Sequence, residues 1–384
     1  MVSITDKIEI LGSASKFDVC ASMATPRKVT TPSDVIGVPT PAGICHAFTP
    51  DGRCMSLFKV LMTNYCSYDC KYCMNANNCS SVKQKTMFTP EELARVFMGL
   101  YVRNYVEGLF LSSGVWKDAD RTMEKIVDAI KLIRENYKFK GYMHIKILPG
   151  TSKDLIKQVM EVADRVSINV ELPSASHLNE VSSTKDFDRD IIRCQQTIQD
   201  YFNKGLLPAG QTTQFIVGAT DETDKDIIKM LEWEYKNVGL KRGYFTAFNP
   251  VKDTPLENQI GEKHEREVQL YRIDWLYRKY NYGVQEILNI LNEDEMLPLK
   301  GDPKLMMAMK DDRIPLDVNE ASVAELLRVP GIGEISAKRI VNLREVGQKI
   351  TGHADLQRVG VVVKRARPFL IVNGKRETRL TDFF

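Results

Sequence analysis

The sequence predicts an α/β protein in which a partial (β/α)6 barrel of the TIM type precedes a small all-α domain. Between residues 57 and 282, short apolar runs alternate with amphipathic stretches, and six such strand–helix units favour a parallel sheet with right-handed crossovers. Six units are too few for a closed eight-unit barrel, so we expect a curved, partly open sheet. Near the C-terminus, "LLRVPGIGEISAKRIVNLR" over 326–344 predicts two helices joined by a tight, glycine-containing hairpin.

The expected strands are short apolar or β-branched runs. They cover 57–63, 108–115, 142–148, 165–172, 212–219 and 242–251. The expected helices, whose apolar residues recur at helical spacing, cover 90–104, 120–137, 153–163, 187–204, 224–238 and 264–281. Thr89 and Ser152 are the predicted N-caps of two of these helices, and Pro90 suits a first helical turn.

These elements divide the chain into five expected segments. They are an irregular N-terminal extension over 1–55, the barrel over 56–282, a helical connector over 283–316, the hairpin domain over 317–370 and a tail over 371–384. No apolar run approaches about 18 residues and the N-terminus lacks a signal-peptide pattern, so we expect a cytoplasmic protein with no membrane partner. In that reducing compartment, clustered cysteines are more often metal ligands than disulfides.

The most specific chemical pattern is C-x3-C-x2-C, formed by Cys66, Cys70 and Cys73 just after the first expected strand. Parallel α/β folds place their ligands at this end of the strands. Three thiolates would leave one iron of a [4Fe–4S] cluster open to a molecule with an amino and a carboxylate group, such as S-adenosylmethionine (SAM). The alternative is a structural metal site in which Cys79 is the fourth ligand.

With Tyr72 as the aromatic residue before the third cysteine, the sequence resembles the radical SAM superfamily. The resemblance implies a [4Fe–4S] cluster on the three cysteines and SAM as its cosubstrate. It also implies SAM contacts at three strand ends, although the usual glutamate after the second strand is missing and a glutamine replaces one glycine. The implied contacts are Ser112, Ser113 and Gly114 near the amino group, Asn169 and Glu171 on one face of the fourth strand, and Gln214, Ile216 and Gly218 along the adenine, with Asp221 or Glu222 near the acidic position.

The C-terminal hairpin is the second specific pattern. Gly331, Ile332 and Gly333 would present backbone N–H groups at a helix start, which favours an anion. Lys338 and Arg339 follow one turn later. The stretch resembles helix-hairpin-helix motifs, which hold a backbone phosphate without reading bases. The alternative is a purely structural αα-hairpin.

Basic side chains continue beyond this hairpin. Residues 360–369 look like a degenerate second hairpin, in which the basic residues are Lys364, Arg365 and Arg367. Residues 313–384 contain 13 Lys or Arg against 8 Asp or Glu, a net charge of +5 in a chain whose total is +3. This local excess favours a polyanionic partner.

Several stretches together resemble a narrower group, the DNA modification/repair radical SAM proteins. Among them are "GICHAFTPDGRCMSLFKVLMTNYCSYDCKYC", "SINVELP" and the PGIG hairpin followed by "VVVKRAR". This resemblance implies DNA as the substrate and a uracil-DNA-glycosylase-like protein as a partner.

Two further sets of residues are candidates for function. Cys45 and Cys54 are candidate ligands of a second cluster or donors of a hydrogen atom to a substrate radical, the alternative being inert buried thiols. In the final "ETRLTDFF", the apolar side chains resemble a peptide that docks replication proteins on sliding clamps, with Glu377 replacing the usual glutamine; the alternative is a frayed terminus. The apolar residues of this tail are Leu380, Phe383 and Phe384.

We therefore expect an enzyme that cleaves SAM with electrons from an external donor. The resulting 5′-deoxyadenosyl radical would abstract hydrogen from a flipped or single-stranded nucleotide in DNA. One alternative is the same chemistry on RNA, such as tRNA base modification. Another is a non-catalytic iron–sulfur protein that binds DNA or senses redox state.

Overall fold

The chain folds into two compact units. The computed structural model describes residues 2–15, 43–48, 54–80 and 84–376. Unit 1 comprises residues 1–222 and 229–263, and unit 2 comprises residues 223–228 and 264–384. The division near residue 263 differs from the expected boundary at residue 282, because the long helix over 264–280 groups with the C-terminal unit.

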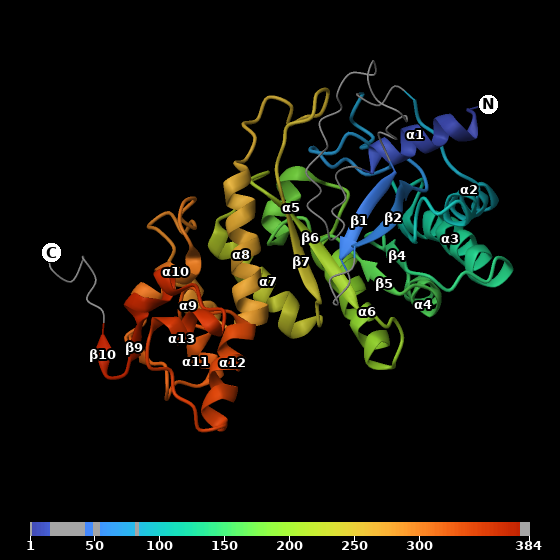
Figure 1. The fold of residues 1–384 in the computed structure, drawn as a ribbon. Coiled ribbons are helices and arrows are strands. Elements are labelled where there is room, and N and C mark those ends of the chain that lie inside the picture. Colours follow the sequence, from blue (N-terminus) through green and yellow to red (C-terminus); the bar gives the residue numbers. More distant parts are fainter. Residues whose placement is uncertain (1, 16–42, 49–53, 81–83, 377–384) are drawn as a thin grey trace, which may run out of the picture. The chain divides into compact units, whose positions relative to one another are not determined.

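Unit 1 is built on a curled seven-stranded sheet whose strands lie side by side in chain order (Figure 1). The strands are β1 (Ile44–Phe48), β2 (Cys54–Leu61), β3 (Gly108–Ser112), β4 (Met143–Lys146), β5 (Arg165–Ser167), β6 (Gln211–Val217) and β7 (Arg242–Ala247). β1 is antiparallel to β2, and β2 to β7 are all parallel to their neighbours. The six parallel strands confirm the predicted (β/α)6 partial barrel.

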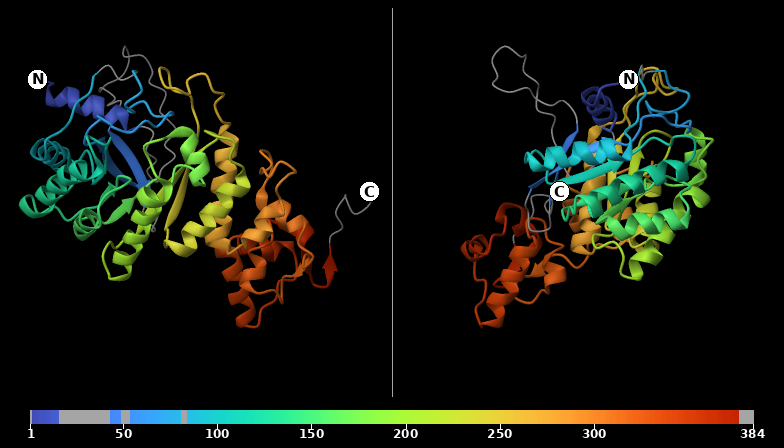
Figure 2. Two further views of the ribbon diagram at one scale, coloured as in Figure 1. Left: turned by 180° about the vertical axis from the view of Figure 1, so that it is seen from behind. Right: turned by 90° about the vertical axis from the view of Figure 1, so that its right-hand side faces the viewer.

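Helices cover the outer, convex face of this sheet (Figures 1 and 2). They are α2 (Pro90–Val102), α3 (Ala119–Lys131) with the π-helical η1 (Leu132–Asn136), α4 (Lys153–Val162), the π-helical η2 (Phe187–Ile192), α6 (Arg193–Asn203) and α7 (Asp224–Asn237). The face they cover is apolar, since the fully buried Phe58, Phe215 and Phe245 point outward from β2, β6 and β7. The sheet and these helices thus share an apolar interface. Two further helices lie elsewhere: α1 (Ile4–Ala14) packs against β2, and α5 (Ala175–Val181) contacts the loop that follows β2.

Local capping explains where two of these helices begin. Thr89 caps α2, because its hydroxyl accepts a hydrogen bond from the Glu92 N–H while the Glu92 carboxylate accepts one from the Thr89 N–H. Ser152 is the N-cap of α4, but its side chain makes no capping hydrogen bond. Its N–H instead donates to Asp120 at 2.8 Å.

The N-terminal extension, expected to be irregular over 1–55, contains α1 and β1 in its described part. α1 begins at a capping box formed by Ser3 and Asp6. β1 exists because it pairs in register with β2, from Ile44 opposite Phe58 to Phe48 opposite Cys54. Such non-local pairing stabilises a strand whose own sequence carries little strand pattern.

Unit 2 is mainly helical and contains the predicted hairpins. Its helices are α8 (His264–Tyr280), α9 (Val284–Leu288), α10 (Pro303–Met309), α11 (Val323–Leu326), α12 (Glu334–Glu345), α13 (His353–Arg358), α14 (Val363–Ala366) and the 3-10 turn η3 (Arg367–Phe369). Leu326, Val329, Ile332 and Leu356 are buried in one apolar core that the two hairpins share.

A short three-stranded sheet also belongs to unit 2, which the expected all-α domain did not include. Its order is β10-β9-β8, with β8 (Leu316–Asp317), β9 (Leu370–Val372) and β10 (Lys375–Arg376). β8 and β9 pair in parallel, with Leu316 opposite Leu370. Because both hairpins lie between these two strands in the chain, no local pattern could predict the pairing.

Candidate cofactor site and helical hairpins

The loop that follows β2 carries the three cysteines of the C-x3-C-x2-C pattern. Backbone hydrogen bonds join this loop to the residues after β3. The Gly114 N–H donates to the Thr63 carbonyl and the Ser67 N–H donates to the Val115 carbonyl, each at 2.8 Å. A Cβ on Gly114 would come within 2.4 Å of the Tyr65 carbonyl oxygen. Glycine at this position therefore allows the two loops to approach closely.

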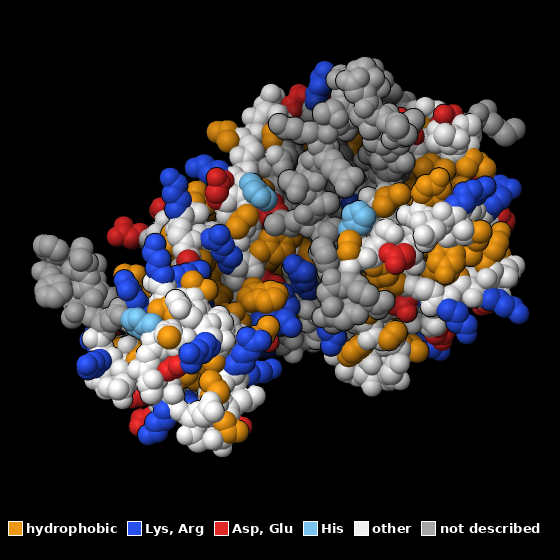
Figure 3. Space-filling view, viewed as in Figure 1, with side chains coloured by type: hydrophobic (Ala, Val, Ile, Leu, Met, Phe, Trp, Pro, Cys, Tyr) orange, Lys and Arg blue, Asp and Glu red, His pale blue; other side chains and the backbone are white. Residues whose placement is uncertain are grey.

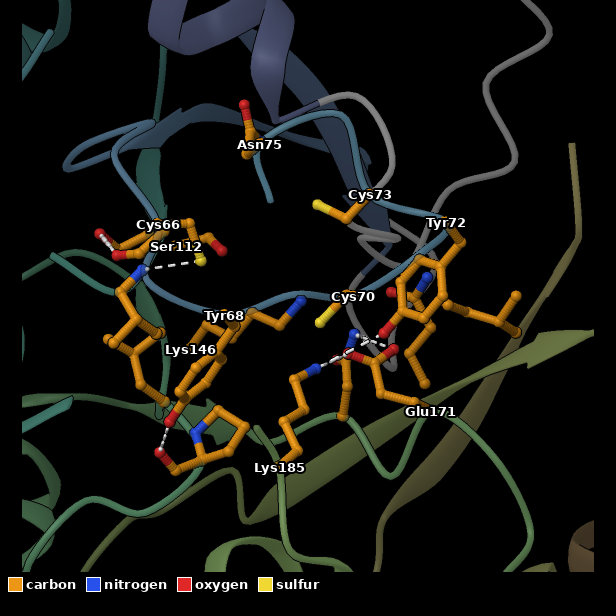
Figure 4. Close-up of a pocket in the computed structure, with 18 of the residues that line it drawn as sticks. Cys66, Tyr68, Cys70, Tyr72, Cys73, Asn75, Ser112, Lys146, Glu171 and Lys185 are labelled. Carbon is orange, nitrogen blue, oxygen red and sulfur yellow. Dashed lines mark hydrogen bonds and ion pairs between the residues drawn. The ribbon is translucent and has the colours of Figure 1, made fainter. Parts of the chain in front are cut away.

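The sulfur atoms of Cys66, Cys70 and Cys73 point toward one another across a common space in an open cavity (Figure 4). The cavity lies at the carboxyl ends of the parallel strands and is lined from β2, β3, β4, β6 and β7. Cys79 is buried but is not among the residues that line this cavity. The structure therefore groups the three cysteines of the pattern without the fourth.

Asp69 anchors the cysteine loop to the segment after α5. Its carboxylate accepts hydrogen bonds from the hydroxyls of Ser182, Ser183 and Thr184 and from the Ser183 backbone N–H. Burial alone would raise the pKa of Asp69, but the hydrogen bonds, foremost that from Ser183, hold it well below its usual range. The loop is thus tied to a second element by an ionised side chain.

The thiols suit ligation of a metal cluster. Burial raises the pKa of Cys70, and burial together with the charge of Cys70 raises the pKa of Cys73 to about 12. Packing several thiolates together is unfavourable unless iron compensates their charge. The Val115 N–H donates to the Cys66 sulfur at 3.4 Å, a contact typical of cluster-bound cysteine.

A buried ion pair lies beside Cys70 and was not predicted. Lys185 donates to Glu171 at 3.1 Å, and both side chains are almost fully buried. Lys185 also lies 3.5 Å from the Tyr72 hydroxyl. Lys185 comes from the polar stretch before η2, where no periodicity or spacing marks it, so sequence reasoning had no signal for it. The cavity also contains Tyr68, whose hydroxyl donates to the Pro149 carbonyl at 2.8 Å.

The structure gathers eight of the residues predicted to contact SAM around this cavity. The lining includes Tyr72, Ser112, Ser113, Gly114, Asn169, Glu171, Gln214 and Ile216. Gly218 is not in the lining; its N–H donates to the Glu222 carboxylate, and its φ of +83° marks a turn after β6. Glu222 therefore shapes this turn, and Asp221, whose side chain is 88% exposed, lies 3.5 Å from His177.

Asn169 and Glu171 lie beyond the strand on which they were expected. β5 ends at Ser167, and Glu171 has a φ of +65°, which regular strands do not adopt. A single bridge to Phe215 continues the pairing at Glu171. The two side chains still face each other, since the Asn169 amide donates to Glu171 at 3.3 Å.

Cys45 and Cys54, the candidate ligands of a second cluster or thiol donors, lie on opposite faces of the sheet. Cys45 is paired with Leu57 and packs with Leu57 and Phe110 on the inner face. Cys54 is exposed at the start of β2, three residues before Leu57, and so points the other way. Joint ligation of a second cluster does not fit this register.

In unit 2, the hairpin between α11 and α12 has the predicted glycine geometry. Gly331 has a φ of +88°, and a Cβ there would come within 2.6 Å of the Val362 carbonyl oxygen. Gly333 is the N-cap of α12 with extended backbone. Ile332, predicted as a contact residue, is 1% exposed, and its N–H donates to the Val329 carbonyl. It therefore serves the core rather than the surface.

The degenerate second hairpin packs against the first. Gly360 has a φ of +89°, close to that of Gly331, and the Val362 N–H donates to the Gly331 carbonyl at 3.0 Å. A Cβ on Gly360 would lie 3.3 Å from the Ser336 hydroxyl and 3.5 Å from Arg339. Each hairpin glycine thus contacts the other hairpin's helix region, so the two form one compact pair.

The basic residues of the two hairpins are exposed, and Lys and Arg side chains are frequent on the pictured face of unit 2 (Figure 3). They are Lys338, Arg339, Lys364, Arg365 and Arg367. Arg365 also pairs with Asp302. The predicted tail residues Leu380, Phe383 and Phe384 lie outside the described part of the chain.

Comparison with family models gives a match for the cysteine-containing region and another for the hairpins. Residues 60–233 match the model of the radical SAM superfamily, and residues 312–366 match that of the helix-hairpin-helix motif. Residues 60–233, which contain the three cysteines, are therefore similar to the radical SAM superfamily. Proteins of this superfamily use a [4Fe–4S] cluster and SAM, and the three cysteines and polar lining of the cavity fit that pair. A comparison with curated proteins found no match.

Solved structures that are similar to this chain share low sequence identity with it. Methylornithine synthase is 14% identical, with a TM-score of 0.43 over 53% of this chain and 56% of that one. The [FeFe]-hydrogenase maturase from Carboxydothermus hydrogenoformans is 13% identical, with a TM-score of 0.45 over 57% and 51%. A radical SAM methyltransferase from Sphaerobacter thermophilus is 11% identical, with a TM-score of 0.41 over 61% and 74%. The chain thus spans about half the length of the first two.

Two features are absent from the described residues. None of their helices is long and apolar enough to cross a membrane. No group of three or more His, Cys, Asp or Glu side chains among them surrounds a single-ion site.

Proposed function

We propose that this protein is a radical SAM enzyme that modifies a nucleotide within a nucleic acid, with DNA as the substrate. The observation that carries the proposal is the presence, in one chain, of a three-cysteine radical SAM cavity and a pair of hairpins with exposed basic residues. When bound, the cluster and SAM supply a 5′-deoxyadenosyl radical that removes hydrogen from an unreactive carbon.

The chain's own residues would bind and orient the reactants. Cys66, Cys70 and Cys73 would hold the cluster, and the carboxyl end of β3 would receive the SAM amino group through Ser112 and Ser113. The buried ion pair of Lys185 and Glu171 lines the same cavity. Each charged group of this pair keeps a fixed orientation, because the two groups bind each other and are shielded from water. The substrate would bind in the same cavity beside SAM.

The hairpins would hold the substrate backbone. N–H groups at the start of α12 and the exposed Lys338 and Arg339 suit a phosphate. Because such contacts carry no base specificity, they position a strand and leave recognition of the target to the cavity. A base inside a duplex would have to be flipped out or unpaired to reach the cysteine-lined cavity.

Further partners follow from the family resemblance. The proposal includes an external electron donor, a uracil-DNA-glycosylase-like protein and a sliding clamp that binds residues 377–384. If the clamp is retained equally by the full chain and by a variant lacking 377–384, the tail has no docking role.

The decisive test measures two activities separately. Cluster-loaded protein with SAM and dithionite should release 5′-deoxyadenosine, and Cys70→Ala should abolish the release while oligonucleotide binding persists. Binding of duplex DNA, single-stranded DNA and single-stranded RNA should be compared over a series of salt concentrations. The double variant Lys338→Met with Arg339→Met should reduce the slope of log affinity against log salt concentration by about two. Tighter binding and faster release with RNA would assign the substrate to RNA. Release without any nucleic-acid binding would contradict the proposal.

A further inference from the structure

A buried lysine lies directly behind the first hairpin of unit 2. Lys304 is 7% exposed, and its ammonium donates a hydrogen bond of 2.6 Å to the Ile332 carbonyl. Ile332 belongs to the glycine-containing turn between α11 and α12. Lysine is rarely buried, because moving an ammonium out of water costs free energy that its contacts must offset. The buried ammonium of Lys304 is therefore in direct contact with the turn.

The start of α10 places Lys304 at this position. Asp302 is the N-cap of the helix, and its side chain accepts a hydrogen bond of 3.0 Å from the Lys304 N–H. The same carboxylate pairs with Arg365 of α14, which belongs to the second hairpin. The first turn of α10 is therefore tied to both hairpins, to one through Lys304 and to the other through Asp302.

An aromatic ring from α8 also contacts the ammonium. The Lys304 Nζ lies over the Tyr280 ring at 4.5 Å from its centre, and such a cation–π contact favours the charged form of the lysine. A Cβ built on Gly333 would lie 3.4 Å from the Tyr280 hydroxyl, so Tyr280 lies close to the turn as well. Lys304 and Tyr280 thus support the segment of Ile332 and Gly333 together.

The peptide between Ile332 and Gly333 connects Lys304 to the start of α12. This peptide is trans, so its C=O and N–H groups point in opposite directions. Because the carbonyl is directed at the buried Lys304, the Gly333 N–H is directed away from it, at the N-cap of α12. A hydrogen bond to the carbonyl polarises the peptide and makes its N–H a stronger donor.

We infer that Lys304 is a positioning residue for phosphate binding, because its ammonium orients and polarises the peptide whose N–H faces the phosphate. The inference rests on the proposed function, in which this hairpin holds a phosphodiester of the substrate. Standard bond and hydrogen-bond lengths put a phosphate oxygen on the Gly333 N–H at about 7–8 Å from the Lys304 Nζ. Lys304 thus adds a buried cation to the exposed Lys338 and Arg339.

Protonation of Lys304 gives this role a signature in the pH dependence of binding. Burial lowers the pKa of Lys304 to about 7. The titratable and charged groups around it are Tyr280 from α8, Asp302 from α10 itself and Arg365 from α14, and the last two pair with each other. The ammonium, which dominates at low pH, favours a bound phosphate, and the phosphate in turn favours the ammonium. Affinity for DNA should therefore fall as the pH rises through about 7.

Coulomb's law gives the size of this effect. For a separation of about 8 Å and an effective dielectric constant of about 20 to 40, loss of the ammonium weakens the binding of one phosphate by about 5- to 30-fold. An effect in the middle of this range means that binding at about pH 7.5 takes up about half a proton per chain. A merely structural role for Lys304 would produce no such uptake.

The test titrates the full-length, cluster-loaded protein with duplex and with single-stranded DNA between about pH 6 and 9 at constant ionic strength. Wild-type affinity for the form that binds more tightly should fall by about 5- to 30-fold over this range. Lys304→Met should bind as weakly at all pH values as the wild type does at about pH 9. Lys304→Arg, whose guanidinium stays charged, should bind tightly throughout, and its profile contains the contributions of all other titrating groups.

Calorimetry in two buffers of different ionisation enthalpy measures the proton uptake. The wild type should take up about half a proton at about pH 7.5, and both variants should take up none. The wild-type measurement needs no variant, so it tests the inference even if a variant fails to fold. Absence of uptake by the wild type would overturn the inference.

Lys310→Met is the matched control. Lys310 is the C-cap of the same helix, and its ammonium also donates a hydrogen bond of 2.6 Å to a backbone carbonyl, that of Asn289. This lysine is exposed, and its partner lies outside both hairpins. Lys310→Met should keep the wild-type affinity and pH profile. If it loses affinity as Lys304→Met does, the effect comes from the net charge of unit 2 and the inference is wrong.

The inference and the proposed function fail in different ways. If DNA binds but Lys304→Met keeps the wild-type affinity and pH profile, the role of Lys304 is wrong and the nucleic-acid proposal stands. If RNA alone binds and its affinity follows the Lys304-dependent profile, the inference stands and DNA is the wrong substrate. If neither nucleic acid binds at any pH, both are wrong.

Discussion

Replacing Gly331 by alanine tests whether the hairpin needs glycine for its shape or for its surface. A side chain at a φ of +88° costs about 1–2 kcal/mol. The new Cβ would also lie 2.6 Å from the Val362 carbonyl oxygen and 3.0 Å from the Arg365 Cβ, and relieving such overlap costs about 1–3 kcal/mol more. We expect the local opening free energy around the hairpin to fall by about 2–5 kcal/mol.

Hydrogen exchange measured by mass spectrometry resolves this change within the full chain. Protection of peptides from 326–345 should fall by about 30-fold to several thousand-fold, while peptides from β2 to β4 keep wild-type protection. Gly333→Ala is the matched control, because its Cβ would meet only the Tyr280 hydroxyl at an ordinary 3.4 Å and its backbone is already extended. Unchanged protection in Gly331→Ala would refute the reasoning.

Three other predictions concern unit 1. Burial raises the pKa of Glu234 to about 8, and a hydrogen bond from Gln195 offsets part of this rise. Because the unfolded carboxyl ionises at lower pH, the free energy of unfolding should fall by up to about 5 kcal/mol between about pH 4.5 and 8. In urea titrations, Glu234→Gln should show a flatter dependence of the free energy of unfolding on pH. Gly114→Ala should lower bound iron per chain after reconstitution, since its Cβ would displace the cysteine loop; wild-type iron content would contradict the close approach. Cys79→Ser should keep the iron content that Cys70→Ser loses, whereas equal losses would favour a four-cysteine site.

The sequence was informative wherever a local pattern sets the structure. Six strand–helix units predicted the six parallel strands, and the C-x3-C-x2-C spacing predicted which thiols share the cavity, because both depend on neighbours in the chain. The hairpin glycines likewise encode their positive φ locally, at Gly331 and Gly360.

Features that depend on distant partners were missed. β1 forms only by pairing with β2, and β8 pairs with β9 across the whole hairpin domain. Lys185 enters the site because the segment after α5 is tied to Asp69 in the cysteine loop.

The central claim is that Cys66, Cys70 and Cys73 alone hold a cluster with one open iron. Electron paramagnetic resonance of the reduced protein, combined with iron and sulfide analysis, tests it most directly. We expect four irons and four sulfides per chain and a spectrum of a reduced [4Fe–4S] cluster that changes when SAM is added. A colourless protein with one tetrahedral metal ion, or a cluster spectrum indifferent to SAM, would contradict the account.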